Sequence, residues 1–89
     1  MKEEEIEILN SNDWGKCIRI ITQYWDSEYG TIDIEGKDGK QTLELTTGGW
    51  SDNEELIDKI SDTWFWLLWW QESKRGGYYK FVYSEKIEY

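Results

Sequence analysis

The segment TGGWSDNEELIDKISDTWFWLLWWQESKRGG, residues 47–77, decides the fold. Ser51 is followed three residues later by Glu54, which is the spacing of a helix capping box. Gly76 is placed where a left-handed residue ends a helix, directly after two basic residues that suit the negative end of a helix dipole. The segment therefore predicts one long helix from about residue 52 to residue 74 or 75.

The two sides of this expected helix differ when residues are placed at 100° per step. One apolar stripe is expected to face a sheet, and it comprises Leu56, Ile57, Ile60, Trp64, Leu67 and Leu68. The opposite side begins with acidic and basic residues and ends with aromatic ones, namely Glu55, Asp58, Lys59 and Asp62, then Phe65, Trp66, Trp69 and Trp70. Four large aromatic side chains in water would rival or exceed the apolar patch of a few hundred Å² that a typical monomer exposes. We therefore expect a partner-binding surface made of the four aromatic residues with Asp58 and Asp62.

Three kinds of cover for that surface remain open. The chain itself could supply it, from the N-terminal Ile6, Ile8 and Leu9, from a loop at Trp14, or from a tail with Ile87 and Tyr89. A second copy of the chain could pack the rings across a twofold axis. A foreign protein could use them as a hot spot, since Trp and Tyr are enriched at such positions.

Four further segments are expected to be strands, because apolar and polar residues alternate along them or apolar residues occupy both sides. They are Cys17–Trp25, Thr31–Glu35, Gln41–Thr47 and Tyr78–Ser84. The turn Gly36–Gly39 contains Asp-Gly, a strong hairpin signal. The expected fold is α+β: a three-stranded antiparallel meander, one long helix packed on the sheet and a final strand, in the order β-β-β-α-β. The final strand is expected next to the first strand or on an edge.

The length of 89 residues allows one domain, residues 1–89, in which residues 1–13 fit either an edge strand or a first helical turn. The core of so short a chain is thin. Cys17 is the only cysteine, so no intrachain disulfide is possible. Seven Trp, six Tyr and two Phe supply the bulk that a short chain otherwise lacks.

The formal net charge of −9 argues against direct binding to nucleic acid or to anionic membranes, which both attract basic proteins. It favours basic protein partners, although acidity also serves to keep a Trp-rich protein soluble. The acidic N-terminus lacks the apolar run of a signal peptide, and the apolar run 64–70 is far shorter than the ~20 residues of a membrane span. With a single thiol, these features predict a cytoplasmic protein.

The sequence carries no recognisable catalytic or metal motif. The absence of histidine excludes Ser-His and Cys-His nucleophiles and Cys/His zinc sites. Gly48-Gly49-Trp50-Ser51 leads into a helix N-terminus, a geometry that can hold an anion on backbone amides. The motif lacks a phosphate-loop ending, and the acidic residues that follow it would repel phosphate. We expect no enzyme activity, cofactor or metal, and treat this turn as a candidate ligand site only.

The second half of the chain resembles short proteins encoded by bacteriophages and prophages, which share a run of T-G-G-W-S-x-N-E-E, then an apolar helix with F-W and a later W, then R-G-G-x-Y-x-F. The corresponding segments here are Thr47–Glu55, Phe65-Trp66 with Trp69 and Trp70, and Arg75–Phe81. The resemblance implies a phage or prophage origin and no catalytic role. Small acidic phage proteins include inhibitors that occupy nucleic-acid-binding grooves, as several anti-CRISPR proteins do.

The sequence therefore predicts a phage-derived acidic module that binds a host protein, such as a nucleic-acid-binding defence complex. Two alternatives come from other classes of function. One is a small-ligand or nucleotide module at Gly48, Gly49, Trp50 and Ser51, and the other is a self-associating phage structural protein, for example a homodimer.

Overall fold

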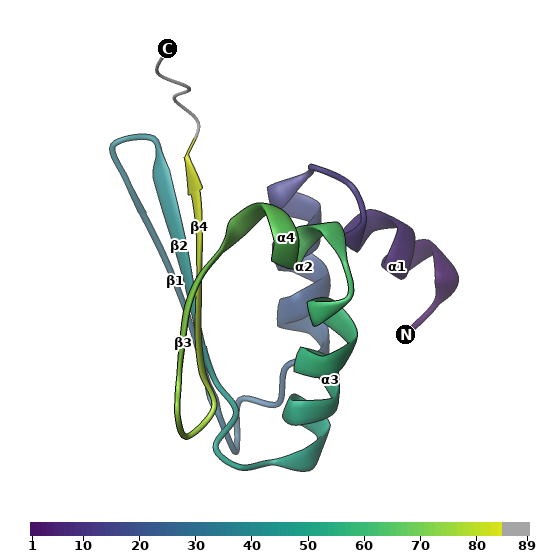
Figure 1. The fold of residues 1–89 in the computed structure, drawn as a ribbon, viewed down its shortest axis with the longest axis vertical. Coiled ribbons are helices and arrows are strands. Elements are labelled where there is room, and N and C mark those ends of the chain that lie inside the picture. The colour runs from purple at the N-terminus through teal and green to yellow at the C-terminus, as the bar shows by residue number, and fades with distance from the viewer. Residues whose placement is uncertain (85–89) are drawn as a thin grey trace.

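A computed structural model describes residues 1–84 as four helices and a four-stranded antiparallel sheet. The helices are α1 (Glu3–Leu9), α2 (Trp14–Tyr24), α3 (Ser51–Ser61) and α4 (Trp64–Trp69). Figure 1 shows α2, α3 and α4 on one face of the sheet, with α1 outside them. Within residues 1–84 the other face of the sheet carries no helix, so this part of the chain forms two layers (Figure 1).

The strands are β1 (Thr31–Lys37), β2 (Lys40–Thr46), β3 (Trp70–Lys74) and β4 (Tyr78–Ser84), in the spatial order β1-β2-β4-β3. The α+β class and the three strands 31–37, 40–46 and 78–84 are as expected from the sequence. The expected order β-β-β-α-β is wrong, because two helices precede the first strand. The expected position of the last strand is also wrong: β4 lies inside the sheet, between β2 and β3, and not on an edge.

Helix α2 replaces the strand that was expected at Cys17–Trp25, and α1 resolves the ambiguous start of the chain as helix. Asp13 caps α2, because its carboxylate accepts a hydrogen bond from the Lys16 backbone N–H at 3.1 Å. The buried residues of α2 follow a helical spacing: Trp14, Cys17, Ile20 and Ile21. Packing of this apolar face overrides the β propensity of the Ile-rich run.

The long helix expected over residues 52–75 is three elements: α3, α4 and β3. The break between α3 and α4 falls at Asp62 and Thr63, and the hydroxyl groups of residues 61 and 63 bond there to carbonyls of the last turn of α3. Ser61 Oγ donates to the Asp58 carbonyl and Thr63 Oγ1 to the Ile60 carbonyl, each at 2.7 Å. The helix then begins again at Trp64 with a different phase.

Two hairpins close the sheet. Asp38 and Gly39 have φ of 54° and 76° between the paired Lys37 and Lys40, which confirms the Asp-Gly turn. Gly76 and Gly77 also have positive φ, but they lie in the turn from β3 to β4 and do not end a helix. The left-handed conformation predicted for Gly76 is confirmed, but its predicted position at the end of a helix is wrong.

The core lies between the sheet and the helices. Its fully buried large side chains come from every layer, among them Leu9, Ile21, Leu43, Leu45, Ile60, Phe65 and Phe81. In β2 the apolar Leu43 and Leu45 alternate with polar residues, so the bare face of the sheet is mainly polar there, while β4 adds Tyr78 and Val82 beside Lys80 on that face.

Candidate functional site

The aromatic residues expected to face outward on the second half of the helix are largely turned inward. Phe65 is fully buried, with ring centroids 5.8 Å from Trp14 and 4.8 Å from Phe81. Trp69 meets the Trp14 ring edge-on at 5.4 Å, and Trp66 meets Phe81 edge-on at 5.3 Å. The outward orientation predicted for these three residues is therefore wrong. Of the kinds of cover left open, Trp14 of the same chain covers Phe65 and Trp69.

The residues expected to face the sheet from α4 are the exposed ones. Their exposed fractions are Trp64 54%, Leu67 75% and Leu68 46%. They are three and four residues apart, so they lie on one side of the helix. Trp70, which begins β3, is 45% exposed and is the one member of the predicted aromatic set that faces solvent as expected. We name Trp64, Leu67, Leu68 and Trp70 the α4 surface.

The break at residues 62 and 63 explains this inversion. A continuous helix would carry the phase of α3, in which Leu56, Ile57 and Ile60 are buried, into α4. After the break, the side of α4 that faces the core is not the one that continues the buried side of α3. Phe65 is therefore buried, and Trp64 is exposed. The run Ser61-Asp62-Thr63 is the sequence signal for the break, since all three residues favour local side-chain hydrogen bonds over helix continuation.

A shallow hollow lies beside the α4 surface and includes part of it. Its lining residues are Asn10, Ser61, Asp62, Thr63, Trp64 and Leu67. The Trp64 backbone N–H donates to Asn10 Oδ1 at 3.1 Å, which joins the start of α4 to the end of α1. Asp62 thus lies beside the exposed Trp64 and Leu67, which the sequence predicted on the opposite side of the helix. Asp58 is exposed one turn earlier on α3. Rigid apolar groups with a carboxylate at the rim suit a protein contact.

The candidate ligand turn is packed against the loop that precedes β1. Gly48 and Gly49 have φ of 65° and 73°, and a Cβ on Gly48 would lie 1.5 Å from the Tyr29 carbonyl oxygen. The Trp50 ring stacks on Tyr29 with centroids 4.1 Å apart. Close backbone contact and ring stacking account for this Gly-Gly-Trp sequence structurally.

The capping box expected at Ser51 and Glu54 is wrong. The helix begins one residue earlier, with Trp50 at the N-cap and Ser51 already in the first turn, and no side chain caps it. The start of α3 is held instead by Asn53, which is fully buried. Its amide accepts from the Asp26 backbone N–H at 2.8 Å and donates to the carbonyls of Asp26 and Thr47 at 3.1 and 3.3 Å.

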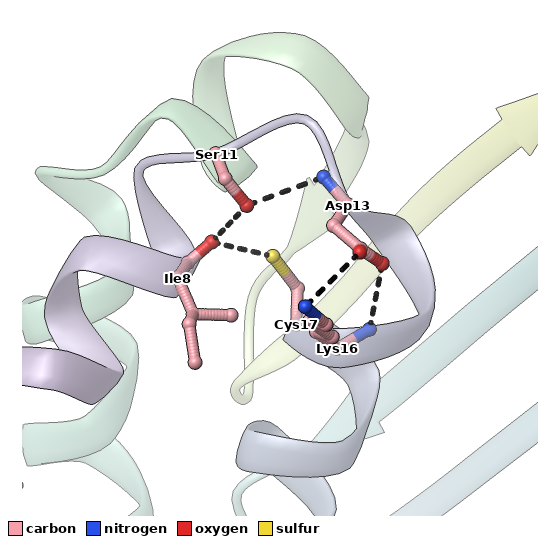
Figure 2. A network of polar contacts seen from close by, with 5 residues as sticks. All are labelled: Ile8, Ser11, Asp13, Lys16 and Cys17. Atoms are coloured by element: carbon pink, nitrogen blue, oxygen red, sulfur yellow. Dashed lines mark hydrogen bonds and ion pairs between the residues drawn. The ribbon is translucent and has the colours of Figure 1, made fainter.

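Cys17 belongs to a polar network between α1 and α2 (Figure 2). Its thiol donates to the Ile8 carbonyl at 3.2 Å, and Ser11 Oγ donates to the same oxygen at 2.6 Å. Burial raises the pKa of the Cys17 thiol to about 11. A buried protonated thiol is a packing residue and a poor nucleophile.

The bare face of the sheet carries interleaved charges. Lys80 is paired across the strands with Glu44 on one side and Glu72 on the other. Burial and then the two carboxylates raise the pKa of Tyr78 on this face. Lys74 Nζ lies 5.2 Å from the Tyr78 ring centroid, within the range of a cation–π contact.

Residues 1–84 contain no group of three or more His, Cys, Asp or Glu side chains arranged to hold a metal ion. Over the same part of the chain, every helix is too short or too polar to cross a membrane. Comparison with protein-family models, with curated proteins and with solved structures gave no match for this chain.

Proposed function

We propose that the chain is a small acidic protein-binding module and that its α4 surface contacts the partner. The observation that carries the proposal is the exposure of four large apolar side chains, Trp64, Leu67, Leu68 and Trp70, within seven residues of α4 and the start of β3. A monomer gains nothing from leaving such side chains in water, and exposed apolar surface of this kind marks interaction sites.

The partner we propose is a basic protein of the host cytoplasm. The net charge of −9 speeds encounter with a positive surface and opposes encounter with a second copy of the chain. The resemblance to phage and prophage proteins supports a host target, with a nucleic-acid-binding defence protein as the class to test first. In this role the chain acts by occupying a surface and carries out no chemistry.

The experiment compares wild type with Leu67→Ser in affinity capture from bacterial lysate, followed by titration calorimetry with the purified partner. Ile6→Ser is the matched control, because Ile6 is 40% exposed, lies on α1 and is not one of the four residues of the α4 surface. We expect Leu67→Ser to weaken binding by about tenfold or more, as for a hot-spot residue, and Ile6→Ser to bind like wild type. Equal binding by all three proteins would contradict the role of the α4 surface.

Self-association is the second candidate, because an apolar surface can also pack across a twofold axis. Sedimentation equilibrium of wild type and Leu67→Ser separates the two. A dimer that dissociates in Leu67→Ser would replace the foreign partner with a second copy, whereas a monomer at all concentrations supports the foreign partner.

A further inference from the structure

Strand β1 forms one edge of the sheet, and within residues 1–84 it pairs with β2 alone. Its seven residues pair with β2 in an unbroken register from Thr31 to Lys37. The opposite edge, β3, is shorter and has a register shift between Trp70 and Glu72. Irregularity of this kind protects an edge from further pairing, so β1 is the edge that remains open (Figure 1).

Every second residue of β1 points its backbone N–H and C=O away from β2, towards the open edge. The side chains alternate between the two faces of the sheet. Ile32 and Ile34 are opposite the buried Leu45 and Leu43, so they lie on the helix side. Ile34 is nevertheless 47% exposed, since it stands at the margin of the core with no neighbour outside it in the sheet. An added strand would cover it.

On the bare face of the sheet, β1 presents Asp33, Glu35 and Lys37, all exposed. Asp33 is directly opposite Glu44, and Glu35 is opposite the uncharged Thr42. Across the sheet from Asp33, the first basic residue is Lys80 on β4, which is separated from Asp33 by Glu44 and is opposite Glu72 on its other side. The margin of β1 is therefore acidic at Asp33 and Glu35, which have no basic residue directly opposite them, and basic at its end, where Lys37 is opposite Lys40.

The charges along β1 distinguish two possible occupants of this edge, a second copy of the chain and a basic segment of another protein. Antiparallel pairing with a second copy centred on Asp33 or Ile34 sets carboxylates directly opposite one another. Like charges directly opposite are destabilising in a sheet. Pairing centred nearer the end of the strand sets Lys37 opposite Asp33 or Glu35, and there the net charge of −9 on each copy opposes association. A strand with basic side chains at positions i and i+2 meets Asp33 and Glu35 with the opposite charge.

We propose that the β1 edge binds an extended segment of a basic partner as a fifth strand. In this arrangement, Lys or Arg side chains of the segment lie over Asp33 and Glu35, and the apolar residues between them cover Ile32 and Ile34. Backbone hydrogen bonds along the edge provide affinity, and the alternating side chains provide specificity. This inference rests on the proposed protein-binding function and concerns the edge of the sheet opposite to β3, where α4 continues into the sheet.

The test uses the full chain labelled with ¹⁵N and a seven-residue peptide of alternating Lys and Val, blocked at both ends. We expect the largest amide shift changes, and new protection from hydrogen exchange, within residues 31–37. A peptide of the same composition with its Lys and Val in two blocks controls for charge alone, and an alternating Glu-Val peptide controls for β propensity. Equal binding of either control, or shift changes centred elsewhere, would overturn the inference.

Matched charge-reversal variants give the second readout. Asp33→Lys/Glu35→Lys alters the β1 edge, and Glu55→Lys/Asp58→Lys alters exposed residues of α3, with the same change in net charge. We expect the β1 variant to lose about tenfold or more in affinity for the alternating peptide and the α3 variant to lose less than about threefold, because only the first removes directly opposed charges. Equal losses would show that the net charge alone attracts the peptide, and would overturn the inference.

Binding measurements on Leu67→Ser show whether a negative result concerns the β1 edge or the proposed function of the α4 surface. The variant is expected to bind the alternating peptide like wild type, because Leu67 lies on α4. If the peptide fails to bind while Leu67→Ser still abolishes binding of the captured partner, the β1 inference is wrong and the α4 surface stands.

Discussion

The rings of Trp14 and Phe65 stack with their centroids 5.8 Å apart, so the first turn of α2 covers the inward side of α4. Trp14 also stacks on Tyr83 at 5.4 Å, and its Nε1–H donates to Gln41 Oε1 at 2.7 Å. One side chain thus joins α2, α4, β2 and β4. The core of this short chain depends on such multiple aromatic contacts, since there is no disulfide to stabilise it.

We predict that Trp14→Ala destabilises the protein by about 3–5 kcal/mol, the range for removal of a buried aromatic side chain. Trp64→Ala is the control, because it removes the same side chain from an exposed position and should cost less than about 1 kcal/mol. Urea unfolding followed by circular dichroism measures both free energies of unfolding. Similar losses for the two variants would contradict the central role of Trp14.

The elements that the sequence predicts well are those with strong local signals. The β1–β2 hairpin follows from alternation around the Asp-Gly turn, and β4 from alternation after Gly77. In both segments, local pattern and tertiary packing agree. The acidic residues Asp52 and Glu54 lie in the first turn of a helix as expected, although the helix begins at Ser51.

The elements that the sequence predicts poorly are those in which two patterns compete. The run Cys17–Trp25 shows β-branched residues at alternate positions, and also Cys17 and Ile21 at helical spacing behind the cap at Asp13. Only contact with Leu9 and Phe65 in the assembled core decides in favour of helix. The aromatic residues of α4 face the opposite way to the prediction for a related reason: the helix is interrupted at residues 62 and 63, and an ideal helical wheel assumes no interruption.

Gly48 and Gly49 provide a matched pair for the turn before α3. Both have positive φ, but a Cβ on Gly48 would collide with the Tyr29 carbonyl, whereas a Cβ on Gly49 meets nothing within 4 Å. We therefore expect Gly49→Ala to cost about 1–2 kcal/mol from the left-handed conformation alone. Gly48→Ala should cost clearly more, and a thermal melt of each variant measures the difference. Equal melting temperatures would contradict the close approach of the two loops.

Asn53 holds the loop before β1 against the start of α3 through three hydrogen bonds. We predict that Asn53→Ala costs about 2–4 kcal/mol, because it leaves the Asp26 N–H and two carbonyls without these partners. Asn12→Ala is the control at an exposed asparagine and should change stability by less than about 0.5 kcal/mol. Denaturant titration of the two variants provides the measurement.

Asn53→Asp sharpens that prediction by adding a pH dependence. A carboxylate at this position would face the carbonyls of Asp26 and Thr47, so its folded-state pKa should rise above the value in the unfolded chain. The folded state then holds the proton more tightly, and the variant should be more stable relative to wild type near pH 4 than at pH 7. A constant difference between the two pH values would show that the amide nitrogen does not face the two carbonyls.

The raised pKa of Cys17 predicts a loss of stability at high pH. The thiol titrates at about 11 in the folded protein against an ordinary value of 9.0. Between these values the unfolded chain releases the thiol proton while the folded chain retains it, so the free energy of unfolding falls as pH rises. The loss should reach about 1 kcal/mol by pH 10. Urea titrations at pH 8 and pH 10 should show this extra loss in wild type and not in Cys17→Ala, which isolates the thiol from the tyrosines. An equal pH dependence in both proteins would mean that the thiol ionises as readily in the folded chain as in the unfolded one, and would contradict its burial between α1 and α2.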